Sequence, residues 1–145
     1  MTQAQLDVLN QYGTEVQIYK VIEELAELIH AYLTATDFDE ELADVAVMME
    51  TLWYILMYNS GKDESYDDPG ASEYNTQYSL AVEASMLIRL LSEIYTKKNK
   101  PKDDLIRCIY RMKRRVYSMT TDKVKAKIEY KLARLADRVK RGTVM

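Results

Sequence analysis

Apolar residues recur every three or four positions along most of the chain, which is the spacing of one face of an α-helix. The pattern predicts a short helix over residues 3–12 that ends at Gly13, followed by a long helix that runs to about Leu33. Thr14, with Gln17 three residues later, is expected to form a capping box at the start of the long helix.

The same spacing, together with the residues that interrupt it, places the remaining helices. Asp37, with Glu40 as the return acceptor, is expected to cap a third helix that runs to about Tyr58, so that residues 1–59 form a helical hairpin. Residues 60–72 combine Gly, Pro, Asp and Ser without an apolar period, which is typical of a linker. Three further helices are expected in residues 73–145, at about residues 73–98, 102–119 and 121–141.

No alternating strand pattern competes with these helices. The expected fold class is therefore all-α: a single domain, residues 1–145, built from two antiparallel helical hairpins and a C-terminal helix. At an offset of 60, Gln17 pairs with Gln77 and Glu23 pairs with Glu83. This weak match leaves two interpretations open, a degenerate repeat of the first hairpin or a coincidence between two amphipathic helices.

The composition agrees with one helical domain, because only 4 Gly and 2 Pro occur in 145 residues and 48% of the residues are apolar. A single cysteine, Cys108, excludes an intramolecular disulfide and a multi-thiolate zinc site, and it fits a reducing compartment. The chain shows no N-terminal leader pattern and no apolar stretch of about 20 residues. We therefore expect a soluble cytoplasmic protein with no membrane partner.

The net charge of -3 conceals a large asymmetry between the two halves of the chain. Residues 1–75 hold 2 Lys and 16 acidic residues, whereas residues 76–145 hold 18 Lys or Arg and 7 acidic residues. The halves could face each other, or one could bind cations while the other binds phosphates. Two solvated surfaces of opposite sign explain the asymmetry equally well.

The acidic half contains two pairs of carboxylates spaced three residues apart, Glu24 with Glu27 and Glu41 with Asp44. This spacing puts the two members of each pair on one helix face, where like charges repel unless they meet a cation or point into water. Asp44 is the only charged residue between positions 42 and 49, on a helix that is apolar nearly all round. An unpaired carboxylate there costs several kcal/mol, which a bound divalent cation can offset.

Four carboxylates without His or Cys favour Mg²⁺ or Mn²⁺ over zinc. Mg²⁺ bound in this way usually keeps waters and recruits phosphate oxygens, and two such ions can hold an attacking water and a leaving phosphate together. The alternative is that the acids form an exposed stripe or pair with Arg or Lys of the basic half.

The run EELAE at residues 23–27, followed by Glu41 and Asp44 in ELAD, resembles the EExxE and ExxD motifs of the MazG-like all-α nucleoside triphosphate pyrophosphohydrolases. This superfamily also includes dimeric dUTPases and phosphoribosyl-ATP pyrophosphohydrolase. The similarity covers about residues 5–58, and residues 124–140 resemble the Lys- and Arg-bearing tail helix of small members. Residues 60–120 match poorly.

The resemblance implies Mg²⁺-dependent hydrolysis of an NTP or dNTP between the α and β phosphates, which gives a monophosphate and pyrophosphate. It implies that Glu24, Glu27, Glu41 and Asp44 are the metal ligands, and that Glu23 orients or deprotonates the attacking water or holds a further ion. Because members of the superfamily build their sites at a dimer interface, we expect a homodimer. The alternative is a monomer in which the second hairpin occupies the place of the partner subunit. The missing acids of the second hairpin imply one site per chain.

Lys131, Arg134 and Arg138 recur on one face of the last helix, and the matching tail of the superfamily reaches triphosphate oxygens. Arg also offers bidentate donors to phosphate. A solvated stripe lying over the core is the alternative for these three residues. Gln17 and Lys20, which precede the acidic cluster on its helix, are weaker candidates for contacts with base, sugar or phosphate.

Two other classes of function compete with the hydrolase. The basic segments KKNKPK (97–102) and RMKRR (111–115) would suit a nucleic-acid-binding module, and a catalytically silent helical regulator would keep the metal for structure alone. The acidic motif favours the hydrolase, so a nucleic-acid partner is not expected. No pattern fixes the preferred base or sugar.

Overall fold

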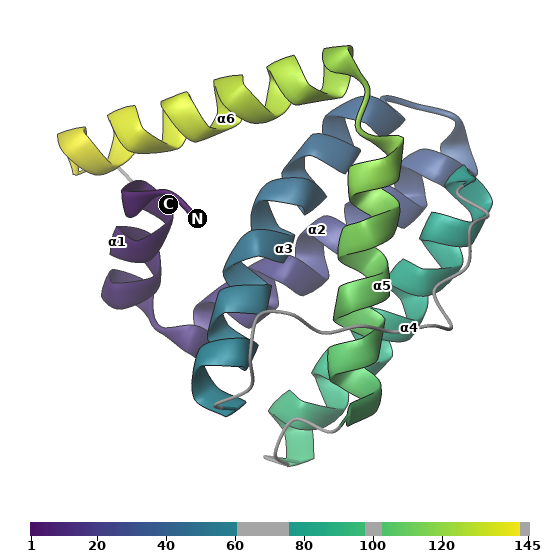
Figure 1. Ribbon diagram of the computed structural model, residues 1–145, viewed down its shortest axis with the longest axis horizontal. Helices are drawn as coiled ribbons and strands as arrows, with labels where there is room; N and C mark the ends of the chain where they lie inside the picture. The colour runs from purple at the N-terminus through teal and green to yellow at the C-terminus, as the bar shows by residue number, and fades with distance from the viewer. Residues whose placement is uncertain (61–75, 98–102, 143–145) are drawn as a thin grey trace.

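The computed structural model describes residues 1–60, 76–97 and 103–142, and this part of the chain is all-helical (Figure 1). Its helices are α1 (Gln3–Tyr12), α2 (Thr14–Thr34), α3 (Phe38–Ser60), α4 (Gln77–Lys97), α5 (Asp103–Met119) and α6 (Asp122–Arg141). The predicted all-α fold class is therefore confirmed. No helix within the described ranges is long and apolar enough to cross a membrane.

Helices α2 to α5 form a bundle in which each helix contacts two neighbours: α2 and α5 each pack against both α3 and α4. Helix α6 crosses α3 and reaches α1, as Figure 1 shows along the top of the molecule. One hydrophobic cluster contains residues of α2 to α6, including the sole cysteine, Cys108. The crossing of α6 matters for function because it brings the basic C-terminal helix onto an acidic helix of the first hairpin.

The N-terminal cap of α2 differs from the expected one. Thr14 is the first helical residue there, preceded by Gly13 at φ 87°, and no side chain caps the helix. The expected capping box of Thr14 and Gln17 is therefore wrong. A capping box forms instead at α1, where Thr2 N donates to Gln5 Oε1 at 2.7 Å and Gln5 N donates to Thr2 Oγ1 at 3.3 Å. The positive φ of Gly13 turns the chain sharply between the two helices, which replaces the expected side-chain cap.

The linker expected over residues 60–72 falls almost entirely outside the described residues. Ser60 is the last residue of α3, and the chain is described again from Thr76. Helix α4 begins at Gln77 rather than at about Glu73, because Ser79 N donates to Thr76 Oγ1 at 3.0 Å and Thr76 N donates to Ser79 Oγ at 2.9 Å. This reciprocal pair fixes the helix start.

Candidate metal centre

The first hairpin brings two pairs of carboxylates together. Glu24 and Glu27 lie on α2, and Glu41 and Asp44 lie on α3. Each acid directly precedes a buried core residue in the sequence: Leu25, Leu28, Leu42 or Val45. Because consecutive residues are about 100° apart around a helix, each acid lies at the edge of the packed α2–α3 interface. Packing of the core residues therefore sets the two pairs opposite each other.

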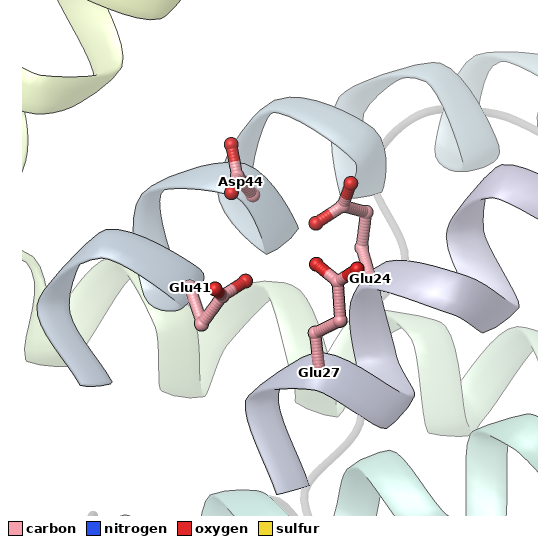
Figure 2. Close-up of side chains that lie close together, drawn as sticks. All are labelled: Glu24, Glu27, Glu41 and Asp44. Atoms are coloured by element: carbon pink, nitrogen blue, oxygen red, sulfur yellow. The ribbon is translucent and has the colours of Figure 1, made fainter. Parts of the chain in front are cut away.

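Figure 2 shows the four side chains facing a common space between α2 and α3. Each residue contributes one oxygen to a group of four atoms that all lie within 4.8 Å of one another. Glu24, Glu41 and Asp44 are partly buried, whereas Glu27 is exposed, so the group is reached from solvent on the Glu27 side. The expected convergence of these four residues is present in the structure.

Two of the four carboxylates are poorly solvated. Glu24 Oε2 and Glu41 Oε2 are buried and have no hydrogen-bond partner. Burial, followed by repulsion from Asp44, Glu27 and Glu41, raises the pKa of Glu24 to about 8. Burial, followed by repulsion from Glu27 and Asp44, raises the pKa of Glu41 to about 7. Without a cation the cluster therefore resists full ionisation near neutral pH.

The opposing cations come from α6. Lys131 Nζ lies 2.8 Å from Asp44 Oδ1 and donates to Glu40 Oε1 at 2.7 Å. Lys127 Nζ donates to Glu40 Oε2 at 2.9 Å. Hydrogen bonds from Lys131 and Lys127 lower the pKa of Glu40 to about 2. The acidic and basic halves of the chain thus meet between α3 and α6, which was one of the open interpretations of the charge asymmetry.

Pairing with the basic half reaches Asp44 but does not extend through the cluster. Across residues 1–57, 76–94 and 103–142, whose side chains are described, no ion pair links a cation to Glu24, Glu27 or Glu41. Three of the four carboxylates therefore have no ion-pair partner among these side chains, although the charge of Lys131 acts on Glu41, and they provide oxygen donors for an added cation.

Glu23 lies beside the cluster on α2 but outside the converging group. Its side chain is 57% exposed, and its Oε2 lies 3.8 Å from Lys20 Nζ. Gln17 is buried on the same helix, two turns before Glu24. The role of Glu23 toward water and the roles of Gln17 and Lys20 toward substrate stay predictions.

The three cationic residues expected to contact substrate lie on α6 at different distances from the cluster. Lys131 reaches it directly through Asp44. Arg134 and Arg138 are exposed and lie farther along the helix axis, by about 4.5 and 10.5 Å at the ordinary rise per residue. Their contact with a triphosphate stays a prediction.

Helix α4 of the second hairpin holds apolar residues at the positions that correspond to two of the acids of α2. At the offset of 60, Ala84 and Leu87 take the positions of Glu24 and Glu27, and both are fully buried. Within the described ranges, the cluster of the first hairpin is the one group of three or more potential metal ligands. The expectation of one site per chain stays a prediction.

Basic side chains of the segment 111–115 make contacts within the protein, although Arg114 is exposed. Arg111 Nε donates to the buried Glu83 at 2.7 Å, and Lys113 Nζ lies 4.8 Å from the ring centroid of the sole tryptophan. These contacts occupy charges that a nucleic-acid surface would present to phosphates. Of the other basic segment, 97–102, only Lys97 at the end of α4 is described, and only by its backbone.

Sequence reasoning missed Glu40 as a partner of the lysines and expected it only at a helix cap. The sequence contained a spacing that indicates this pairing. Glu40 and Asp44 are four residues apart on α3, and Lys127 and Lys131 are four residues apart on α6. That spacing places each pair on one helix face. The crossing of α6 over α3, which brings the two faces together, depends on tertiary packing that no local pattern specifies.

The donor set fits a hard divalent cation. All four side chains offer carboxylate oxygens, two buried oxygens lack a partner, and the remaining repulsion is of the kind that a divalent cation relieves. Comparison of the chain with protein-family models, curated proteins and solved structures finds no match. The resemblance to the MazG-like superfamily therefore rests on the acidic motif and the tail helix.

Proposed function

We propose that the protein is a nucleoside triphosphate pyrophosphohydrolase that depends on Mg²⁺ or Mn²⁺ and cleaves an NTP or dNTP between the α and β phosphates. The products are a nucleoside monophosphate and pyrophosphate, formed from a cytoplasmic nucleotide pool. One observation carries the proposal: four carboxylates of α2 and α3 converge within 4.8 Å, and two keep buried oxygens without a hydrogen-bond partner. A purely structural cluster of this kind would be destabilising, because like charges repel and buried oxygens lose their solvation.

Each residue of the site has a chemical task in this proposal. Glu24, Glu27, Glu41 and Asp44 would hold the cation, which binds phosphate oxygens and stabilises their developing charge. Glu23 is exposed to solvent one residue before Glu24, a position from which it would orient the attacking water or accept its proton.

We further propose that the protein is a homodimer. The cluster is exposed at Glu27, so a nucleotide bound there needs a covering surface. Helix α4 carries exposed apolar side chains at spacings of four, Tyr78, Val82 and Met86, which would suit a second copy of the chain. A compact monomer, in which α4 and α5 take the partner's part, is the alternative. Sedimentation at micromolar concentration separates the two, since a dimer has twice the mass of 16.9 kDa.

The direct test is a screen of common and modified NTPs and dNTPs for pyrophosphate release with Mg²⁺ or Mn²⁺. Asp44→Ala or Glu27→Ala should lower the rate by more than about 100-fold with helix content intact, since changing even an outer partner of a metal ligand costs about 10- to 100-fold. Glu93→Ala, an exposed acid on α4, is the matched control and should retain full activity. An active Asp44→Ala protein would rule out the site.

The screen also separates the hydrolase from the silent regulator. A regulator would melt at a higher temperature with the metal but release no pyrophosphate from any nucleotide. A nucleic-acid-binding module would instead bind RNA or DNA with an affinity that falls by orders of magnitude between low and moderate salt.

A further inference from the structure

Ion pairs between α3 and α6 join the carboxylate cluster to the C-terminal helix. Lys131 Nζ is shared between Asp44, which belongs to the cluster, and Glu40, which lies outside it, at 2.8 and 2.7 Å. The Lys131 side chain is only 19% exposed. Burial alone would lower the pKa of Lys131, but its hydrogen bonds with Asp44 and Glu40 raise that pKa above its ordinary value. Lys131 therefore places its ammonium group at the edge of the cluster, in contact with one of the four carboxylates.

An ammonium group in contact with Asp44 competes with a divalent cation for the same carboxylate. The two cations also repel each other at short range in a partly buried setting. The lysine side chain is a flexible stem of four carbons, so its ammonium can leave Asp44 while α6 stays in place. Glu40 keeps that ammonium nearby, and Lys127 holds the other oxygen of Glu40 at 2.9 Å.

We propose that Lys131 couples the binding of the divalent cation to the binding of the polyphosphate anion. In the metal-free protein Lys131 is the counter-ion of Asp44 and opposes metal binding. A metal that takes Asp44 releases Lys131 to the anion, with Glu40 as its tether. The metal alone then binds weakly, and each ligand strengthens the binding of the other by the same factor. The inference rests on the proposed function, because it assumes the metal centre and a phosphate-bearing substrate.

The surroundings of Glu40 offer room for the anion. A cleft of about 440 Å³ opens there, and Glu40, Lys123, Lys127 and Tyr130 contribute to its lining. A cleft of this volume lies within the range of small-ligand sites. Two lysines place positive charge on its lining beside Glu40, which also binds Lys131, and positive charge is what a polyphosphate requires.

The test compares Lys131→Met with Lys127→Met, a matched control that removes a lysine from the same face of α6 and the same Glu40 without touching Asp44. Electron paramagnetic resonance of unbound Mn²⁺ measures the affinity for the metal alone. Lys131→Met should bind Mn²⁺ about tenfold more tightly than the wild type, because a competing charge is gone. Lys127→Met should change the affinity by less than about twofold.

The second measurement uses calorimetry to determine the affinity of the Mn²⁺-saturated protein for an α,β-methylene nucleoside triphosphate. Lys131→Met should weaken this binding by about tenfold, which reverses the sign of its effect on the metal. Lys131→Gln should repeat both results if the methionine variant fails to fold, as judged by circular dichroism.

The outcomes separate the inference from the function. Failure of both the wild type and Lys131→Met to bind Mn²⁺ overturns the metal centre and the inference together. A wild-type protein that binds Mn²⁺ and releases pyrophosphate, while Lys131→Met binds Mn²⁺ no more tightly, overturns the coupling and leaves the hydrolase standing.

Discussion

Glu24 combines burial with the repulsion of three neighbouring carboxylates, which raises its pKa to about 8. Either a bound proton or a bound cation relieves this destabilisation of the ionised carboxylate. The same side chain is therefore destabilising in the metal-free protein and useful in the metal-bound one, a combination typical of functional sites.

Glu24→Gln should stabilise the metal-free protein at pH 8.5 while it weakens metal binding. The amide removes a charge from the cluster, and we expect a gain of roughly 1 kcal/mol after allowance for solvent screening at a partly exposed site. Urea unfolding in the presence of a chelator measures the gain, and Glu93→Gln on the exposed face of α4 is the control. A destabilised Glu24→Gln protein would mean that Glu24 has a structural partner, contrary to the site described here.

Among the elements, α4 and α5 are joined by a buried charge. Glu83 is 5% exposed and accepts from Arg111 Nε at 2.7 Å, and Arg115 Nε lies 3.9 Å away. The arginines retain some exposure, so the pair is screened more than a fully buried one. The pairing nevertheless binds the two helices of the second hairpin together.

Glu83→Ala should lower the free energy of unfolding by about 2 to 3 kcal/mol, because it removes the buried carboxylate that accepts from Arg111 Nε. Glu93→Ala on the same helix should change it by less than about 0.5 kcal/mol, since Glu93 is exposed. The midpoint of urea unfolding at constant slope measures both. Equal effects of the two substitutions would contradict the structural role given to Glu83.

The sequence predicts helices well and their contacts poorly. Apolar spacing is a local property, so α1, α3, α5 and α6 begin and end close to their expected positions. The four carboxylates were also predictable, because spacings of three set them beside core residues. The cap of α2 was mispredicted because the positive φ of Gly13 replaces a side-chain cap. The meeting of Lys131 with Asp44 depends on how α6 crosses α3, which local spacing does not encode.

At the scale of the whole molecule, the charge asymmetry of the sequence becomes a contact between the acidic helix α3 and the basic helix α6. Beyond Lys131, Asp39 Oδ2 lies 3.8 Å from Lys123 Nζ near the start of α6. The cluster itself keeps an excess of negative charge, so the stability of the metal-free protein depends on pH.

The metal-free protein should lose stability as pH rises from about 4.5 through 8. Burial and neighbouring acids raise the pKa of Glu24 to about 8 and that of Glu41 to about 7, above the ordinary 4.5. The folded state therefore holds these protons more tightly than the unfolded state, and their contribution is lost as pH passes the folded-state values. Thermal melts in chelator between pH 5 and 9 should show this fall.

Saturating Mg²⁺ should reduce the fall, since the metal stabilises the ionised carboxylates. The variant in which both Glu24 and Glu41 are replaced by Gln should lose most of the dependence contributed by these two groups. A melting temperature with the same pH dependence in this variant and in the wild type would contradict the electrostatic account of the cluster.

The most direct measurement is the anomalous X-ray scattering of crystals grown with Mn²⁺. The account predicts Mn²⁺ density in the space enclosed by Glu24, Glu27, Glu41 and Asp44, with carboxylate oxygens at bonding distance. A well-ordered structure at saturating Mn²⁺ that has no density between these residues, or holds the ion elsewhere, would contradict it.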